Sequence, residues 1–139
     1  MSKIQRFGVS LDKDLLSDFD FYIKERKYTN RSEAIRDVIR KSLAANEWKK
    51  SNKVVAGIIT FVYDHHQREL TNKLIHIQHE YHNIVISNQH IHLDHHNCLE
   101  VIITKGKSIK IKELFDSLNS IRGVREGSLV STTTGKNIS

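Results

Sequence analysis

Residues 28–43, YTNRSEAIRDVIRKSL, decide how the beginning of this chain folds. Asn30 can cap a helix, and Glu33 three residues later completes a capping-box pattern. Apolar side chains then recur at helical spacing and give the helix one apolar face. They are Ala34, Ile35, Val38, Ile39 and Leu43. The stretch therefore predicts an amphipathic helix that starts after Asn30 and ends near Glu47.

Two shorter elements precede this helix. Residues 12–27 place four apolar side chains at helical spacing, with Asp12 as the cap. Residues 4–11, IQRFGVSL, alternate between apolar and other side chains at their end, as a short strand does. One copy of this strand-helix-helix segment buries too little apolar surface to be stable alone. We therefore expect two copies to pair their strands into a ribbon.

A two-stranded ribbon fits the major groove of DNA, and its outward side chains can touch base edges. Those outward positions are Arg6, Gly8 and Ser10. The start of the second helix offers free N–H groups beside Arg31 and Ser32, which suits a phosphate. The segment at residues 4–47 resembles the ribbon-helix-helix DNA-binding fold, and NRSEAIRD is its most specific part.

The rest of the chain predicts a second domain. Residues 49–53, KKSNK, are polar and form the predicted linker between domains at 1–48 and 54–139. Periodicity then predicts a strand, a helix, two strands, a helix and a strand at 54–63, 64–80, 83–94, 98–106, 110–121 and 124–133. The order βαββαβ is that of a ferredoxin-like split βαβ fold. The whole chain is thus predicted to be α+β.

Histidine is distributed unevenly, because all nine histidines lie between His65 and His96. His90 and His92 are two apart on a predicted strand, so both rings project from one face. Cys98 opens the next strand and can fold back toward that face, and His79 ends the preceding helix. Three imidazoles and a thiolate suit a late first-row metal. The spacing alone leaves zinc, nickel and copper open.

The remaining histidines are weaker candidates. His65 and His76 are possible alternative ligands, since His76 lies one helical turn before His79. For the others the interpretation as ordinary exposed histidines is favoured: His66, His82, His95 and His96.

Over residues 4–133 the sequence resembles the NikR family of nickel-responsive transcriptional regulators. That family joins a ribbon-helix-helix domain to an ACT-type βαββαβ domain. Its signature H-x13-H-x10-H-x-H-x5-C fits without a gap. The matching residues are His65, His79, His90, His92 and Cys98.

The resemblance implies a nickel-dependent repressor of nickel uptake genes, with one Ni²⁺ per subunit and an operator of double-stranded DNA. His79 of one subunit and His90, His92 and Cys98 of a neighbour would bind nickel in a square plane and join ACT domains into a homotetramer. Glu100 would support the ligands by hydrogen bonding. Glu33 and Asp37 match positions that hold a second cation between domains. Gly8 departs from the family, which commonly has a hydroxyl residue there.

Composition limits the other functions. The net charge of +6 favours a polyanionic partner, and no apolar run is long enough for a membrane span. The start of the chain lacks an apolar signal-peptide core, so cytoplasm is the expected location. We expect no enzyme and no small organic substrate. A zinc hydrolase would need an open coordination position, which a fourth ligand such as Cys98 closes. A zinc or copper regulator and an antitoxin-like DNA binder stay as alternatives.

Overall fold

The structure, a computed structural model, describes residues 3–139. They form two units, of which one ends at Ile39 and the other begins at Arg40. In the first unit, α1 (Lys13–Glu25) starts where the Asp12 carboxylate accepts a hydrogen bond of 2.8 Å from the N–H of Leu15. Helix α2 (Arg31–Lys49) starts where Asn30 Oδ1 accepts one of 2.9 Å from the N–H of Glu33. Both predicted caps are confirmed.

The strand predicted at residues 4–11 is not formed in the single chain, where these residues have no strand pairing. The physical reason is that a strand needs a second strand to complete its hydrogen-bond ladder. Without that neighbour the apolar side chains of the segment stay in solvent, and Phe7 and Val9 are 71% and 60% exposed.

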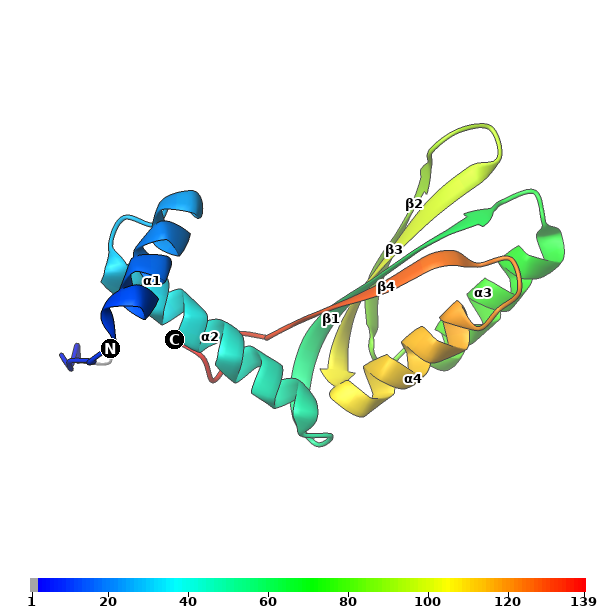
Figure 1. Cartoon of the computed structure of the whole chain (residues 1–139). Coiled ribbons are helices and arrows are strands. Elements are labelled where there is room, and N and C mark those ends of the chain that lie inside the picture. Colours follow the sequence, from blue (N-terminus) through cyan, green and yellow to red (C-terminus); the bar gives the residue numbers. More distant parts are fainter. Residues whose placement is uncertain (1–2) are drawn as a thin grey trace. The chain divides into compact units, whose positions relative to one another are not determined.

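The second unit is one antiparallel sheet with two helices on one of its faces (Figure 1). The strands lie in the order β2-β3-β1-β4, and each neighbouring pair is antiparallel. The elements are β1 (Val54–Asp64), α3 (Arg68–Glu80), β2 (Val85–His92), β3 (Asn97–Lys107), α4 (Ser108–Asn119) and β4 (Arg125–Thr132). The predicted βαββαβ order is confirmed.

Helix α3 begins at Arg68, four residues later than the predicted start at residue 64. The cause is a turn after β1, in which the N–H of Gln67 donates 3.2 Å to the carbonyl of Asp64. Residues 64–67 form this turn, so the helix starts only after them.

The core lies between the sheet and its two helices. Every second residue of β1 is buried, including Ile59, Phe61 and Tyr63. The register places Phe61 opposite Glu100 and Tyr63 opposite Cys98, so β3 turns these two polar residues toward the same helices. No helix within residues 3–139 is both long and apolar enough to cross a membrane.

Candidate metal centre

The pairing of β2 with β3 brings candidate ligands together. His92 lies opposite Cys98, and His90 lies opposite Glu100. Directly opposite residues of an antiparallel pair project from the same face. Two imidazoles and one thiol therefore share the helix-covered face at the edge of the sheet, with Glu100 beside them.

A chain of polar contacts positions His90. Its Nδ1 lies 3.0 Å from the hydroxyl of Tyr63, and its Nε2 lies 2.5 Å from Oε1 of Glu100. The amide of Gln78 on α3 donates a 2.8 Å hydrogen bond to Oε2 of Glu100. Asn88 on β2 donates another of 2.8 Å to Oε1 of Gln78. Both ring nitrogens of His90 thus have partners. A metal that binds one of these nitrogens must displace its partner.

Burial governs the charges around His90. Glu100 has no solvent exposure, and this burial raises the pKa of its carboxyl, while His90 and then Gln78 act in the opposite direction. Burial also raises the pKa of Tyr63, and the neighbouring Glu100 and Cys98 add to the effect. The phenol therefore keeps its proton at neutral pH and can donate it to His90.

Cys98 is buried and His79 is exposed on α3. The single chain does not gather all four predicted ligands. Within residues 3–139, only one group of three or more His, Cys, Asp or Glu side chains has ligand atoms all within 4.8 Å of one another, and its members are Asp64, His66 and His96. His90, His92 and Cys98 share a face, but in the part of the chain that the structure describes their ligand atoms do not all lie within 4.8 Å of one another. As a set, two nitrogens and a sulfur suit a late first-row metal.

The two alternative ligands lie in different surroundings. The ring of His65 meets the ring of His92 edge-on, with 4.7 Å between their centroids. Nε2 of His76 lies 3.1 Å from the carboxylate of Glu80 on the exposed surface of α3. His65 therefore borders the candidate centre, whereas His76 is paired within its own helix.

Sequence reasoning missed Tyr63, Gln78 and Asn88. One signal was available for Gln78, which lies four residues after Leu74 and so falls on the buried face of α3. A polar residue at such a position needs a hydrogen-bond partner. For Tyr63 and Asn88 the contacts depend on tertiary packing.

The predicted DNA-contacting residues all lie at the surface, including Arg6, Gly8, Ser10 and Ser32. Arg31 is paired through two hydrogen bonds of 2.9 Å to the carboxylate of Asp20. This pair holds the pKa of Asp20 below its usual range. A phosphate would have to replace that carboxylate at Arg31.

The two acidic residues predicted to hold a second cation also have protein partners. Glu33 accepts a 2.8 Å hydrogen bond from Arg36. Asp37 accepts one from the hydroxyl of Tyr28, which raises the pKa of Tyr28 to about 12.

Comparisons with known proteins place the chain in a family. Residues 56–132 match the family model described as NikR C terminal nickel binding domain. A protein of Syntrophus aciditrophicus named "Putative nickel-responsive regulator" is 56% identical over 136 residues, covering 98% of each chain. A protein of Pyrococcus furiosus with the same name is 52% identical over 135 residues, covering 97% of this chain and 98% of its own.

A solved structure supports the fold alone. An uncharacterized protein of Thermotoga maritima superposes with a TM-score of 0.52 at 16% sequence identity, covering 57% of this chain and 98% of its own.

The matched family model is a nickel-binding domain, and the relatives that cover nearly the whole chain are named as regulators, so the class of protein is a metal-responsive regulator, which is a regulatory class and not an enzyme class. The chain belongs to the NikR family of nickel-responsive regulators.

Proposed function

We propose that this protein is a nickel-dependent DNA-binding repressor of nickel uptake genes. The observation that carries the proposal is the β2–β3 register, which puts His90, His92 and Cys98 on one face. This face has the donors for one metal ion but lacks the fourth ligand. Regulators of zinc or copper on the same scaffold are the second candidate, because these metals accept the same donors.

The fourth ligand is His79 of a neighbouring subunit in this proposal. His79 is exposed near the end of α3, so a second chain can reach it without disturbing the core. Residues 54–139 would then assemble as a homotetramer that holds one Ni²⁺ per subunit. When bound, nickel supplies a positive charge that holds a thiolate and neutral imidazoles from two chains together. His65 is the alternative donor, since its ring already contacts His92.

Glu100 would act on the metal through His90. Replacing Glu100 by glutamine keeps the shape but removes the negative charge beside Nε2 of His90. We expect Glu100→Gln to weaken nickel binding about 10- to 100-fold, the range found when a partner of a ligand is lost. Competition titration against a chelator of known affinity measures this. The matched control is Glu113→Gln, which makes the same change in a glutamate that forms a surface ion pair with Lys110. Equal nickel affinities for the two variants would rule out this role of Glu100.

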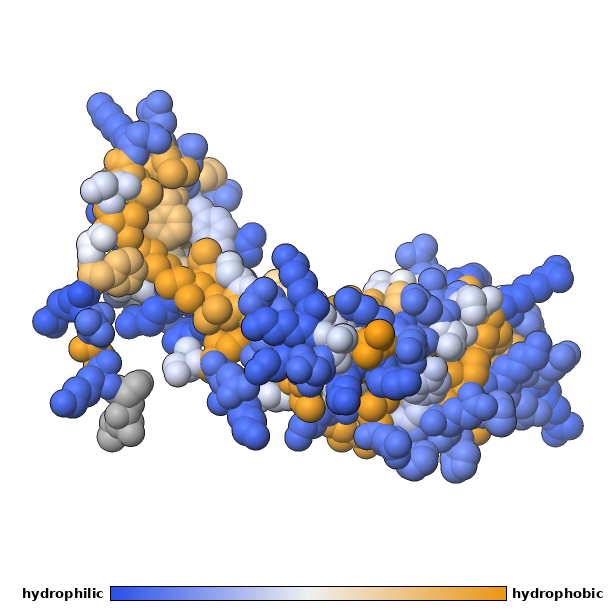
Figure 2. Space-filling view, turned by 90° about the horizontal axis from the view of Figure 1, so that it is seen from below, coloured by the Kyte–Doolittle hydropathy of each residue, from blue (hydrophilic) through white to orange (hydrophobic). Residues whose placement is uncertain are grey.

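The N-terminal segment provides the DNA-binding part of the proposal, with a domain at 1–48 and a linker at 49–53. Apolar side chains gather on the surface of this unit (Figure 2). The exposed ones are Ile4, Phe7, Val9, Leu11, Leu15, Phe21, Val38 and Ile39. Exposed apolar surface that gathers on one unit is typical of an interaction site. A second copy would cover it, and pairing of the two 4–11 segments would complete the ribbon.

Arg6 is expected to read a base edge from this ribbon. Arg6→Ala should cost about 1–3 kcal/mol of specific binding and relax the sequence preference, because arginine is the usual bidentate partner of guanine. The duplex that the nickel-loaded protein recovers from a random library is termed the selected operator. Fluorescence anisotropy would measure the affinity of Arg6→Ala for this duplex. Lys136→Ala removes the same charge from the C-terminal tail and should change little. An unaltered affinity of Arg6→Ala would exclude base reading by this residue.

Nickel and DNA would be coupled by linkage. If the nickel-loaded arrangement of subunits is the one that presents both ribbons to successive half-sites, each ligand must tighten the binding of the other by the same factor. Arg31 and Ser32 would add phosphate contacts. The second cation at Glu33 and Asp37 stays a prediction.

Absorption spectroscopy tests the metal part of the proposal. Titration of the full chain with Ni²⁺ should produce a sulfur-to-nickel charge-transfer band in the near ultraviolet that saturates at one ion per subunit. A titration without that band would show that Cys98 is not a ligand.

A further inference from the structure

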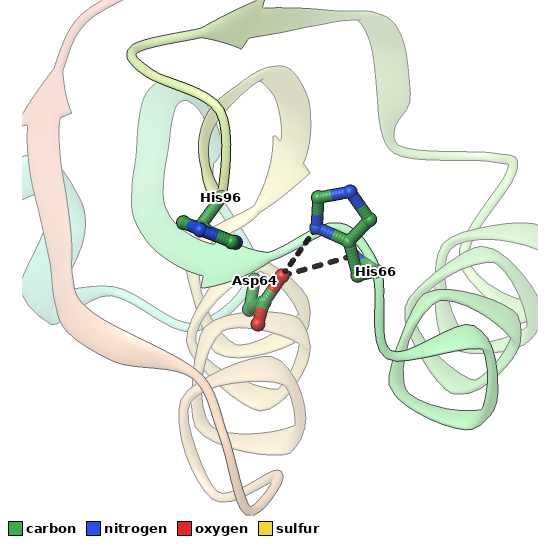
Figure 3. Close-up of side chains that lie close together, drawn as sticks. All are labelled: Asp64, His66 and His96. Carbon is green, nitrogen blue, oxygen red and sulfur yellow. Dashed lines mark hydrogen bonds and ion pairs between the residues drawn. The ribbon is translucent and has the colours of Figure 1, made fainter.

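Three side chains outside the Cys98 centre converge at one end of the sheet. Asp64 ends β1, His66 lies in the turn that follows, and His96 lies in the hairpin between β2 and β3. Their ligand atoms all lie within 4.8 Å of one another. The two imidazoles lie on either side of the Asp64 carboxylate (Figure 3). None of the three belongs to the predicted nickel set.

Backbone hydrogen bonds fix the two turns against each other. The N–H of His65 donates 3.2 Å to the carbonyl of His96, which joins the turn after β1 to the hairpin. Inside the hairpin, Oδ1 of Asp94 accepts hydrogen bonds of 2.8 Å from the N–H groups of His96 and Asn97. The fold therefore holds the backbone that carries Asp64, His66 and His96 in place.

The Asp64 carboxylate is ready to bind a cation. Its Oδ1 accepts a hydrogen bond of 3.0 Å from the N–H of His66 and lies 3.2 Å from Nδ1 of the same residue. Both imidazoles are exposed, and water can complete a coordination shell.

The spacing suits a small divalent ion. Ligands about 2.0–2.2 Å from a metal lie roughly 3–3.5 Å apart in a tetrahedron. Side chains whose ligand atoms lie within 4.8 Å need only rotamer adjustments to reach this spacing. Two imidazoles and a carboxylate favour late first-row metals over magnesium or calcium, which prefer oxygen.

We propose that Asp64, His66 and His96 form a second metal site for late first-row divalent cations such as nickel or zinc. It is open to solvent and contains no thiolate. The proposal does not depend on the proposed function, since it requires neither Cys98 nor DNA.

Equilibrium dialysis of the full chain against Ni²⁺ alone tests this site. We expect His66→Ala/His96→Ala to bind one Ni²⁺ per chain fewer than the wild type at saturation, with the sulfur-to-nickel band unchanged. Asp64→Asn should weaken the same binding step about tenfold or more, since loss of even an outer partner reaches that range. His82→Ala removes an exposed histidine that belongs to neither metal site and is the control.

The outcomes separate the two sites. An unchanged number of bound ions in His66→Ala/His96→Ala would overturn the proposal. Loss of the same ion in His82→Ala would also overturn it, since metal would then bind to exposed imidazoles individually. If the wild type lacks the sulfur-to-nickel band yet His66→Ala/His96→Ala still loses one ion, the new site stands and the Cys98 centre fails.

Discussion

Cys98→Ala should remove the sulfur-to-nickel charge-transfer band and abolish nickel-dependent binding to the selected operator while the chain stays folded. The side chain is 1% exposed and belongs to the core, but its replacement by alanine removes only one sulfur atom. A destabilisation of about 1 kcal/mol is the expected order for such a change. The absorption spectrum measures the band, anisotropy measures binding to the operator, and a thermal melt measures the change in stability.

The control for Cys98→Ala is Ser87→Ala, which changes an exposed residue of β2 and should preserve the band and the DNA binding. In the wild type, nickel affinity should decrease as the pH is lowered, because protons compete with nickel for the imidazoles and the thiolate. Nickel-induced operator binding by Cys98→Ala would show that the proposed ligand set is wrong.

Phe7→Asp should abolish operator binding at every nickel concentration. Phe7 is 71% exposed in the single chain and lies in the apolar surface that we assign to a second copy. A carboxylate buried there without a partner would cost several kcal/mol, which a small dimer interface cannot compensate. Nickel binding and its absorption band should remain, because Cys98 and its neighbours lie in a separate unit.

The control for Phe7→Asp is Asn46→Asp, which adds the same charge at an exposed position of α2. This variant should retain most of the operator binding. Light scattering of a fragment containing residues 1–48 would follow dimerisation directly. Phe7→Asp that still binds the operator as the wild type does would contradict the ribbon.

Local signals were sufficient for much of the fold. Asp12 and Asn30 mark their helix starts by side-chain chemistry, and both act there as caps. The β-branched and aromatic run at residues 54–63 indicated β1, whose buried face carries Phe61 and Tyr63. Residues 4–11 alternate, but they have no strand partner in the described chain, and alternation alone does not form a strand.

The candidate site was predictable only in part. One shared face was suggested by the two-residue spacing of His90 and His92 and by the turn before Cys98. The β2–β3 register places these three residues on one face. The partners of His90 were not predictable, since Tyr63 and Gln78 come from different elements. His66 and His96 were interpreted as ordinary exposed histidines. Their approach depends on one backbone hydrogen bond between His65 and His96, and no sequence spacing reveals it.

Selection of DNA from a random duplex library by the full-length protein, with Ni²⁺ and with a chelator in parallel, tests nickel-dependent DNA binding most directly. The account predicts that nickel-loaded protein enriches duplexes with two matching half-sites and that the chelated protein enriches none. Equal enrichment under both conditions would contradict it, as would enrichment that zinc or copper supports and nickel does not.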